Sequence, residues 1–357
     1  MSIYIHIPFC KSICSYCDFC KFFYDEKRVD EYLISLEKEI KKNYKNDLVK
    51  TIYIGGGTPT SLSLNQLDKL LSITNVFNND LEEFTIETNI DLSIDKIKLL
   101  KKYNINRVSI GVQTINNKHL KFLNRNHTKE DIINLVKNLK SNGIDNINID
   151  LMYGFQNQTL KELEEDLNFI LSLDIKHISI YSLIIEPHTK LYIDNIQNID
   201  EDLDYEMYKL INDKLKENGF IHYEISNYSK ENYESKHNLV YWNNEHYYGF
   251  GLSASGYLDN IRYENTKTYK KYLAENYISD SHQLSLKETI ENEFILGLRK
   301  IDGIDINKFN KKYNIDIKSI ETVNNLLKDN KLIIESNKIK INPKYIYVSN
   351  SILIDFI

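Results

Sequence analysis

The sequence predicts an α/β fold: a partial (β/α)6 barrel followed by a C-terminal helical, winged-helix-like module. Apolar strand-like segments alternate with amphipathic helical segments at a near-regular step through the first half of the chain, which is typical of βα units around a parallel sheet. The pattern changes near Asp200, and from about Leu284 it predicts helices followed by two short strands. Six βα units in about 185 residues favour a partial barrel over a complete eight-unit barrel. An open doubly wound sheet is the alternative.

Six segments rich in Ile and Val are predicted to form the parallel strands, because strands covered on both faces are largely apolar. They are Ser2–Ile7, Lys50–Ile54, Glu83–Glu87, Arg107–Val112, Asn146–Met152 and His177–Leu183. The helices between them have recognisable starts. Ser63 with Gln66 and Thr159 with Glu162 form capping boxes, and Thr128 precedes Asp131 in a related pattern.

Three parts are predicted along the chain. Residues 1–225 form the barrel, residues 226–265 a connecting segment rich in aromatic residues and His, and residues 266–357 the C-terminal module. That module contains a capping box of Ser285 and Glu288. Winged helices often bind DNA, but Arg and Lys are not concentrated on one face, so a structural or docking role is predicted.

The composition excludes several classes of protein. The chain has 357 residues, of which 42% are hydrophobic and 27% charged, which excludes disordered and collagen-like chains. No apolar run reaches the roughly 18 residues of a membrane span, and the start of the sequence lacks a signal-peptide pattern. We therefore expect a soluble, cytoplasmic protein without a transmembrane segment. The formal net charge of −6 gives no global signal for a nucleic-acid partner.

The four cysteines all lie in one 11-residue window directly after the first predicted strand: Cys10, Cys14, Cys17 and Cys20. A disulfide framework would spread its cysteines along the chain and would need an oxidising compartment. Barrel enzymes place their chemistry at the carboxyl ends of the strands. There, C-x3-C-x2-C favours a [4Fe–4S] cluster held by the first three thiolates, with the fourth iron open to a ligand. Tetrahedral zinc and a ferredoxin-like electron-transfer site are the alternatives.

Six motifs follow one another along the chain: YIHIPFC-KSIC-SYC-DF, IYIGGGTPTSL, FTIETN, RVSIGVQ, LNRNH and NIDLMYG. With these motifs the chain resembles the radical S-adenosylmethionine (SAM) proteins, and the resemblance covers nearly the whole chain. Within them it resembles the family of the oxygen-independent coproporphyrinogen III oxidases and the HemW-type heme chaperones, and it is closest to the chaperones. The resemblance implies a radical-SAM barrel that binds a [4Fe–4S] cluster and SAM.

The resemblance also implies which residues contact SAM. Tyr4 and Tyr16 would flank the cluster and the methionine of SAM, and the backbone of Gly56, Gly57 and Thr58 would meet its amino group. The adenosine and the carboxylate would be reached from successive strand ends by Glu87, Gln113, Arg125 and Asp150. The residues themselves favour ligand contacts, because consecutive glycines at a strand end leave room for a ligand. Polar side chains at the ends of apolar strands also favour ligand contacts over core packing.

The fourth cysteine separates the two branches of the family. The decarboxylating oxidases resemble C-x3-C-x2-C-x-C, whereas here Phe19 occupies the fourth position and Cys20 follows it. Cys20 therefore does not match the oxidase pattern. A fourth thiolate would close the iron that SAM needs, so we predict that Cys20 is not a cluster ligand; an alternative ligand, a spare thiol and a structural residue stay open as roles.

Residues 237–242 read HNLVYW and match H-N-x-x-Y-W, which marks the chaperone branch and implies heme binding there. Imidazole is a good axial iron ligand, and aromatic faces suit a flat porphyrin, so His237, Tyr241 and Trp242 are the candidate heme residues. A packing role for Trp242 and a hydrogen-bonded core role for His237 form the alternative.

We therefore predict a heme chaperone that delivers heme to heme-requiring acceptor proteins, by family analogy membrane respiratory enzymes. An oxygen-independent coproporphyrinogen III oxidase of porphyrin biosynthesis is the alternative, and a cluster-binding scaffold without SAM turnover is a third class. Productive cleavage of SAM and the oligomeric state, with a homodimer as one option, stay open at this point.

Overall fold

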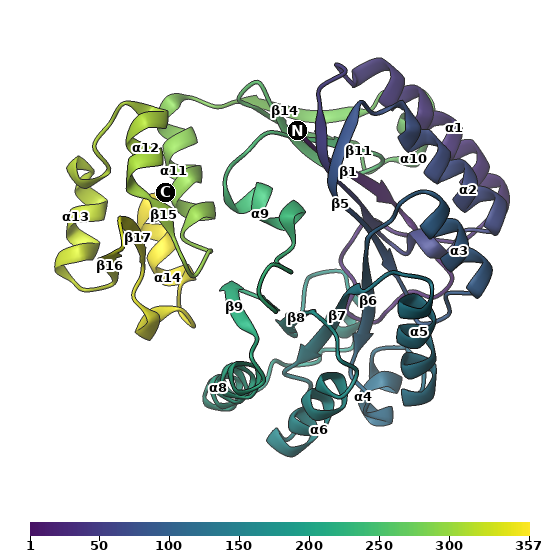
Figure 1. Ribbon diagram of the computed structural model, residues 1–357, viewed down its shortest axis with the longest axis horizontal. Coiled ribbons are helices and arrows are strands. Elements are labelled where there is room, and N and C mark those ends of the chain that lie inside the picture. Colours follow the sequence, from purple (N-terminus) through teal and green to yellow (C-terminus); the bar gives the residue numbers. More distant parts are fainter.

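Six parallel strands form the centre of a twelve-stranded sheet in the computed structural model, which describes residues 1–357 (Figure 1). They lie side by side in chain order: β1 Ser2–Ile7, β4 Val49–Gly56, β5 Asn79–Thr88, β6 Arg107–Gln113, β7 Asn146–Tyr153 and β8 His177–Ser182. The strand order never reverses, whereas a doubly wound sheet reverses at a switch point. All six predicted strands are present, and the predicted partial barrel is confirmed.

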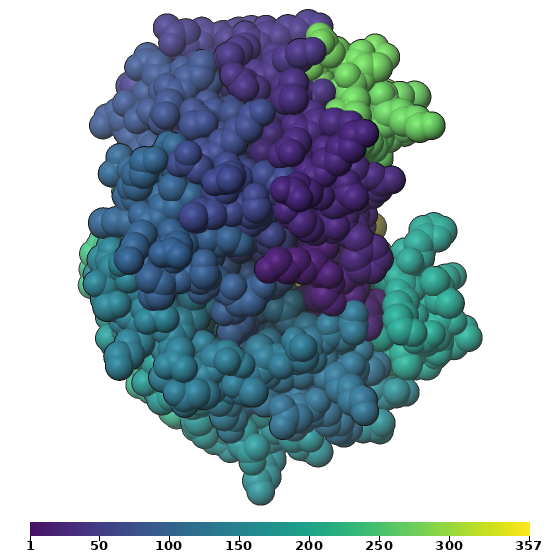
Figure 2. Space-filling model, turned by 90° about the vertical axis from the view of Figure 1, so that its right-hand side faces the viewer, coloured from purple at the N-terminus to yellow at the C-terminus, as the bar shows by residue number.

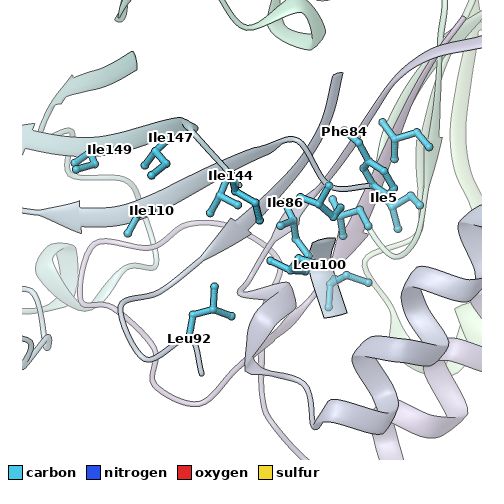
Figure 3. Close-up of a cluster of buried hydrophobic side chains, with 14 of the residues drawn as sticks. Ile5, Phe84, Ile86, Leu92, Leu100, Ile110, Ile144, Ile147 and Ile149 are labelled. Carbon is cyan, nitrogen blue, oxygen red and sulfur yellow. The ribbon is translucent and has the colours of Figure 1, made fainter. Parts of the chain in front are cut away.

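The helices of the βα units cover the outer face of this sheet (Figure 1). They are α1 Glu26–Asn43, α2 Leu64–Ile73, α3 Ile94–Lys102, α4 Asn117–Phe122, α5 Lys129–Ser141, α6 Leu160–Leu171 and α8 Glu201–Glu217. The capping boxes at Ser63 and Thr159 are present, and Thr128 with Asp131 forms a third one. Between sheet and helices lies a core of 52 buried side chains, part of which Figure 3 shows around Ile86, Ile110 and Ile149.

The connecting segment does more than join two parts, because it extends the main sheet at both edges. At one edge β11 Tyr247–Phe250 pairs with β1 in parallel, followed in antiparallel order by β12 Ser255–Leu258, β13 Ile261–Asn265 and β14 Ile278–Gln283. At the other edge β10 Asn227–Ser229 and β9 Ile221–Glu224 continue from β8. A short helix, α9 Lys236–Trp242, lies in the connecting segment, and a second one, α10 Tyr269–Leu273, lies between β13 and β14. The three predicted domain boundaries stay a prediction.

The C-terminal module has its own core of 14 buried side chains. Its helices are α11 Leu286–Gly297, α12 Ile306–Tyr313 and α13 Glu321–Lys328, and its sheet has the order β15-β17-β16, with bounds Ile304–Asp305, Lys338–Ile341 and Leu332–Glu335. Three helices with a hairpin confirm the predicted winged-helix-like module, which is followed by α14 Asn350–Leu353. None of the helices in the protein is both long and apolar enough to cross a bilayer.

Candidate functional site

A cavity of about 1130 Å³ lies where the carboxyl ends of the parallel strands meet the cysteine loop, residues 10–20. Helix α8 and residues 346–348, between β17 and α14, also line it. Figure 2 shows the purple N-terminal segment at the surface, separated by an indentation from the teal segment at the right of the view. The volume slightly exceeds the usual range for a site that holds one small molecule, about 300–1,000 Å³.

The structure separates the cysteines into three that line this cavity and one that does not. Cys10 is buried, Cys14 and Cys17 are half-buried, and all three face the cavity. Cys20 is also half-buried but packs against the barrel core, and its carbonyl lies 3.1 Å from Nε2 of His6. This is the division that the sequence predicts for the cluster ligands.

Hydrogen bonds hold the cysteine loop against the segment that follows α4 and against a short helix after β8. The amide of Ser15 donates to the carbonyl of Leu123 at 3.2 Å, and the carbonyl of Ser15 accepts from the amide of Leu191 at 3.1 Å. Leu191 belongs to a short helix, α7 Lys190–Ile193. The Asn124 amide nitrogen Nδ2 donates to the carbonyl of Ile13 at 2.9 Å. The LNRNH motif therefore acts partly by fixing the position of the loop.

The surroundings of the three thiols fit an iron–sulfur cluster. Arg125 donates from Nη1 to Sγ of Cys14 at 3.3 Å, and such a cation stabilises a thiolate. A Cβ atom on Gly57 would lie 2.9 Å from Sγ of Cys10, so the bare backbone keeps the space beside this thiol open. Burial raises the pKa of the Cys10 thiol to about 11. No three side chains of the metal-binding types are gathered about a single-ion position.

The glycine loop that follows β4 is bonded to the end of β1. The amide of Gly57 donates to the carbonyl of Ile7, and that of Thr58 to the carbonyl of Phe9, both at 2.9 Å. Gly56 has φ of +112°, and a Cβ atom there would lie 2.5 Å from the His6 ring. A side chain at this position would therefore be both strained and obstructed.

Two carboxyl groups at strand ends face the cavity. Glu87 accepts from the Tyr53 hydroxyl at 2.7 Å and from the amide of Gly56 at 3.0 Å. Asp150 accepts from Nδ2 of Asn148 at 2.7 Å. Shielding from bulk water in the barrel raises the pKa of Glu87 to about 7 and raises that of Asp150 as well. Both groups are therefore enclosed acceptors with capacity for ligand hydrogen bonds.

Gln113 and Arg125 complete the strand-end set. Gln113 has φ of +70° although it is not a glycine, a conformation that is uncommon and concentrated at functional sites. Arg125 is half-buried and also donates from Nη2 to Oδ1 of Asn89 at 3.0 Å. Both side chains face the cavity.

Eight of the nine residues predicted to contact SAM line the cavity; Tyr4 does not. The Tyr4 hydroxyl lies 2.9 Å from Nδ1 of His6, beneath the cysteine loop. Tyr16 is half-buried and lines the cavity beside Cys14.

The comparisons with known proteins agree with this geometry. The radical SAM superfamily matches residues 4–170. The heme chaperone HemW of Bacillus subtilis (strain 168) is 45% identical and covers 87% of this chain and 86% of its own length. The heme chaperone HemW of Lactococcus lactis subsp. lactis (strain IL1403) is 40% identical and covers 100% of this chain and 97% of its own length. The chain belongs to the HemW family of the radical SAM superfamily.

A solved structure supports the fold assignment of this HemW family member. The coproporphyrinogen III oxidase HemN of Escherichia coli, a radical SAM enzyme, has a TM-score of 0.87 with 21% identity. The similarity covers 99% of this chain and 89% of that chain. At this identity it shows a shared fold.

The H-N-x-x-Y-W segment of this HemW family member forms α9, which packs against β4 and β5 on the inner side of the barrel (Figure 1). His237 is fully buried, with Nδ1 2.8 Å from Oγ1 of Thr51 and Nε2 2.7 Å from the Tyr241 hydroxyl. Burial lowers the pKa of His237 to about 3. Trp242 is half-buried, with the Arg299 guanidinium 5.8 Å from its ring. None of the three candidate heme residues lines the cavity, whereas Asn238 does, and their role in heme binding stays a prediction.

The part of the cavity lined by the end of β8, the loop after it, α8 and residues 346–348, called the α8 side below, contains residues that the sequence analysis missed. It combines carboxyl groups with aromatic side chains from distant parts of the chain: Glu186, Glu201, Asp204, Tyr153, Tyr181, Tyr208, Tyr228 and Tyr347. The Tyr347 hydroxyl donates to Oδ2 of Asp204 at 2.8 Å. No local motif marks these residues, because tertiary contacts alone bring them together. Arg107, at the start of a predicted strand, was missed for the same reason.

Proposed function

We propose that this protein is a heme chaperone that holds a [4Fe–4S] cluster on Cys10, Cys14 and Cys17, binds SAM, and delivers heme to acceptor proteins. Membrane respiratory enzymes are the proposed acceptors, and the cytoplasm is the proposed site of action. The observation that carries the proposal is the chaperone name of relatives that match nearly the whole chain at 40–45% identity. The cavity volume of about 1130 Å³ exceeds what one small ligand needs, so the cavity is consistent with binding of SAM together with a second ligand.

The residues at the strand ends define what the chain itself contributes at the SAM side. A [4Fe–4S] cluster with an open iron supplies one-electron chemistry toward SAM when it is bound. Arg125 stabilises the Cys14 thiolate at 3.3 Å. Glu87 and Asp150 offer carboxylate oxygens to ligand hydroxyl groups, and Gln113 offers an amide in a fixed, strained position.

The α8 side of the cavity favours heme over the oxidase substrate. Coproporphyrinogen III carries a propionate on every pyrrole ring, whereas heme carries propionates on only two. Glu186 and Asp204 are half-buried on this side of the cavity and Glu201 is exposed, and their like charges disfavour a ligand that carries more carboxylates. The aromatic side chains beside them offer apolar surface for a porphyrin plane.

Anaerobic reconstitution with iron and sulfide, followed by parallel assays, tests the proposal. We expect cluster absorbance, stoichiometric binding of hemin seen in the Soret band, and transfer of that heme to an apo-acceptor in membrane vesicles. We also expect no conversion of coproporphyrinogen III with SAM and a reductant. Steady conversion to protoporphyrinogen would overturn the chaperone function in favour of the oxidase, and absence of hemin binding would refute it outright. The Cys14→Ser variant is the control for the part that the cluster plays in each assay.

A further inference from the structure

Arg107 is a buried cation on the inner face of the barrel. It is the first residue of β6, at the opposite end of that strand from Gln113. The residue is only 1% exposed, yet its side chain lines the cavity. The six residue steps from Arg107 to Gln113 span about 20 Å, so Arg107 starts far below the cysteine loop.

The guanidinium of Arg107 has no partner within the protein. Its Nε atom is buried without a hydrogen bond, and the side chain forms no ion pair or hydrogen bond. The carboxyl groups of Glu87 and Asp150 feel its charge, but each accepts hydrogen bonds from other groups. A buried charge without a contacting anion is costly, since desolvation is not compensated. A ligand anion in the cavity would supply the missing contact.

Asn238 on α9 lies at the same level of the barrel. The amides of Lys236 and His237 donate to Glu83 of β5 at 2.8 and 3.2 Å, which ties the start of the helix to that strand. Two residues further along β5, Thr85 pairs in register with Arg107.

The side chain of Asn238 also faces the cavity. The side-chain amide of Asn238 makes no hydrogen bond within the protein. In contrast, Asn148, which also lines the cavity, uses both the nitrogen and the oxygen of its side-chain amide in bonds to neighbouring side chains. Arg107 and Asn238 therefore both present unused donors to the cavity floor.

We infer that Arg107 and Asn238 form a carboxylate-binding site at the floor of the cavity, and, on the proposed function, that the carboxylate is a heme propionate. A planar guanidinium suits a carboxylate because it donates two parallel hydrogen bonds. The amide of Asn238 adds a neutral donor. The only other cavity-lining cations are Lys21 and Arg125, which lie at the cysteine-loop end, so Arg107 alone supplies positive charge at this depth.

Comparison of hemin with hemin dimethyl ester tests this site, because the ester keeps the porphyrin plane and the iron but lacks the carboxylates. We expect the wild-type protein to bind hemin more tightly than the ester. Arg107→Gln is expected to weaken hemin binding by about tenfold to a hundredfold, as for a lost hydrogen bond to a charged group, and to leave ester binding unchanged. Asn238→Asp places a carboxylate against the propionate, so it should weaken hemin binding more than ester binding, with Asn238→Ala as its control.

The outcomes separate this inference from the proposed function. Equal loss of hemin and ester affinity in Arg107→Gln, or no preference for hemin in the wild-type protein, would overturn the propionate site while the chaperone function stands. A fall in SAM affinity with unchanged hemin affinity would assign the carboxylate to SAM. No hemin binding by the wild-type protein would refute the proposed function itself. Circular dichroism checks folding, and Asn238→Asp keeps the test decisive if Arg107→Gln does not fold.

Discussion

The hydroxyl of Tyr241 lies 2.7 Å from Nε2 of His237, one helical turn earlier on α9. The other ring nitrogen of His237 lies 2.8 Å from Oγ1 of Thr51 on β4. His237 thus joins the helix to β4, and Tyr241 occupies the second ring nitrogen of His237. An imidazole that uses both nitrogens in this way must break a hydrogen bond before it can bind iron.

Replacement of His237 by Ala should destabilise the protein and leave the iron coordination of bound heme unchanged. Loss of two buried hydrogen bonds should lower the free energy of unfolding by about 2 kcal/mol or more. Urea unfolding and the Soret band of the hemin complex measure the two effects. His237→Gln keeps a polar group and should be less destabilised. A shifted Soret band with unchanged stability would instead identify His237 as the axial ligand.

Replacement of Cys10, Cys14 or Cys17 by Ser should abolish the cluster, because each thiol faces the cavity. After anaerobic reconstitution, we expect iron content and visible absorbance of these variants at background. Cys20→Ser is the matched control. This variant should retain the cluster, because Cys20 does not line the cavity. Equal loss in all four variants would show that Cys20 is a ligand and would contradict the open iron site.

Much of the barrel could be predicted from the sequence because its signals are local. The first strand, Ser2–Ile7, has the predicted bounds since parallel strands read as continuous apolar runs. The capping boxes were equally informative. In contrast, β14 Ile278–Gln283 is exposed along its whole length, so no hydrophobic pattern reveals it. It exists because β13 offers an edge to pair with, which is a long-range property.

The candidate site, like the barrel, could be predicted from the sequence where its residues form a local pattern. Three cysteines in a short loop and polar residues at strand ends are sequence patterns, and the fold brings them together at one edge. Arg107 reads in the sequence as the start of a strand, and only the folded barrel shows that its Nε atom is buried without a partner. Tyr347 lies 143 residues from Asp204 in the chain, so its contact with the cavity has no local signature.

Glu87→Ala and Asp150→Ala should weaken binding of SAM to the reconstituted protein without loss of the cluster. Both carboxyl groups line the cavity and neither contacts a cysteine. Each lost hydrogen bond should cost about 1 kcal/mol, which is about fivefold in affinity. Equilibrium dialysis with labelled SAM measures the change. Glu186→Ala, which removes a carboxyl group from the α8 side of the cavity, is the control. An equal loss of SAM affinity in all three variants would argue against specific contacts of Glu87 and Asp150 with SAM.

The buried carboxyl group of Glu39 should make stability depend on pH. Glu39 is 1% exposed and accepts hydrogen bonds from the amide of Gly251 at 2.8 Å, from Asn265 at 2.6 Å and from the Tyr272 hydroxyl at 2.5 Å. Burial raises its pKa from 4.5 to about 7. The folded state therefore binds this proton more tightly than the unfolded state, and its contribution to stability falls as pH rises from about 4.5 through about 7.

Glu39→Gln removes this titration. The stability advantage of the wild-type protein over the variant should shrink by about 2 to 3 kcal/mol between pH 5 and pH 8. Urea unfolding of both proteins at several pH values measures the difference and cancels the titration of all other groups. A constant or growing advantage across this range would show that Glu39 is ionised in the folded protein at pH 5.

The hydrogen bond from Tyr347 to Asp204 should hold residues 346–348 over the cavity. The Tyr347 ring also packs against Tyr205 and Tyr208 of α8, with centroids 5.0 and 5.1 Å away. Tyr347→Phe removes only the hydroxyl, so packing should persist while the bond of 2.8 Å to the carboxylate is lost. A hydrogen bond to a charged group contributes about 1.5 to 3 kcal/mol, so local opening should become at least about tenfold more frequent.

Hydrogen exchange detected by mass spectrometry measures that opening directly. Peptides that cover residues 343–349 should exchange faster in Tyr347→Phe, while peptides from β4 and β5 should not change. Tyr345→Phe is the matched control, because Tyr345 packs against the core of the C-terminal module and its ring lies beneath Lys344. Unchanged exchange in Tyr347→Phe would show that ring packing alone fixes this segment, and equal acceleration in both variants would place the effect in the module and not at its contact with α8.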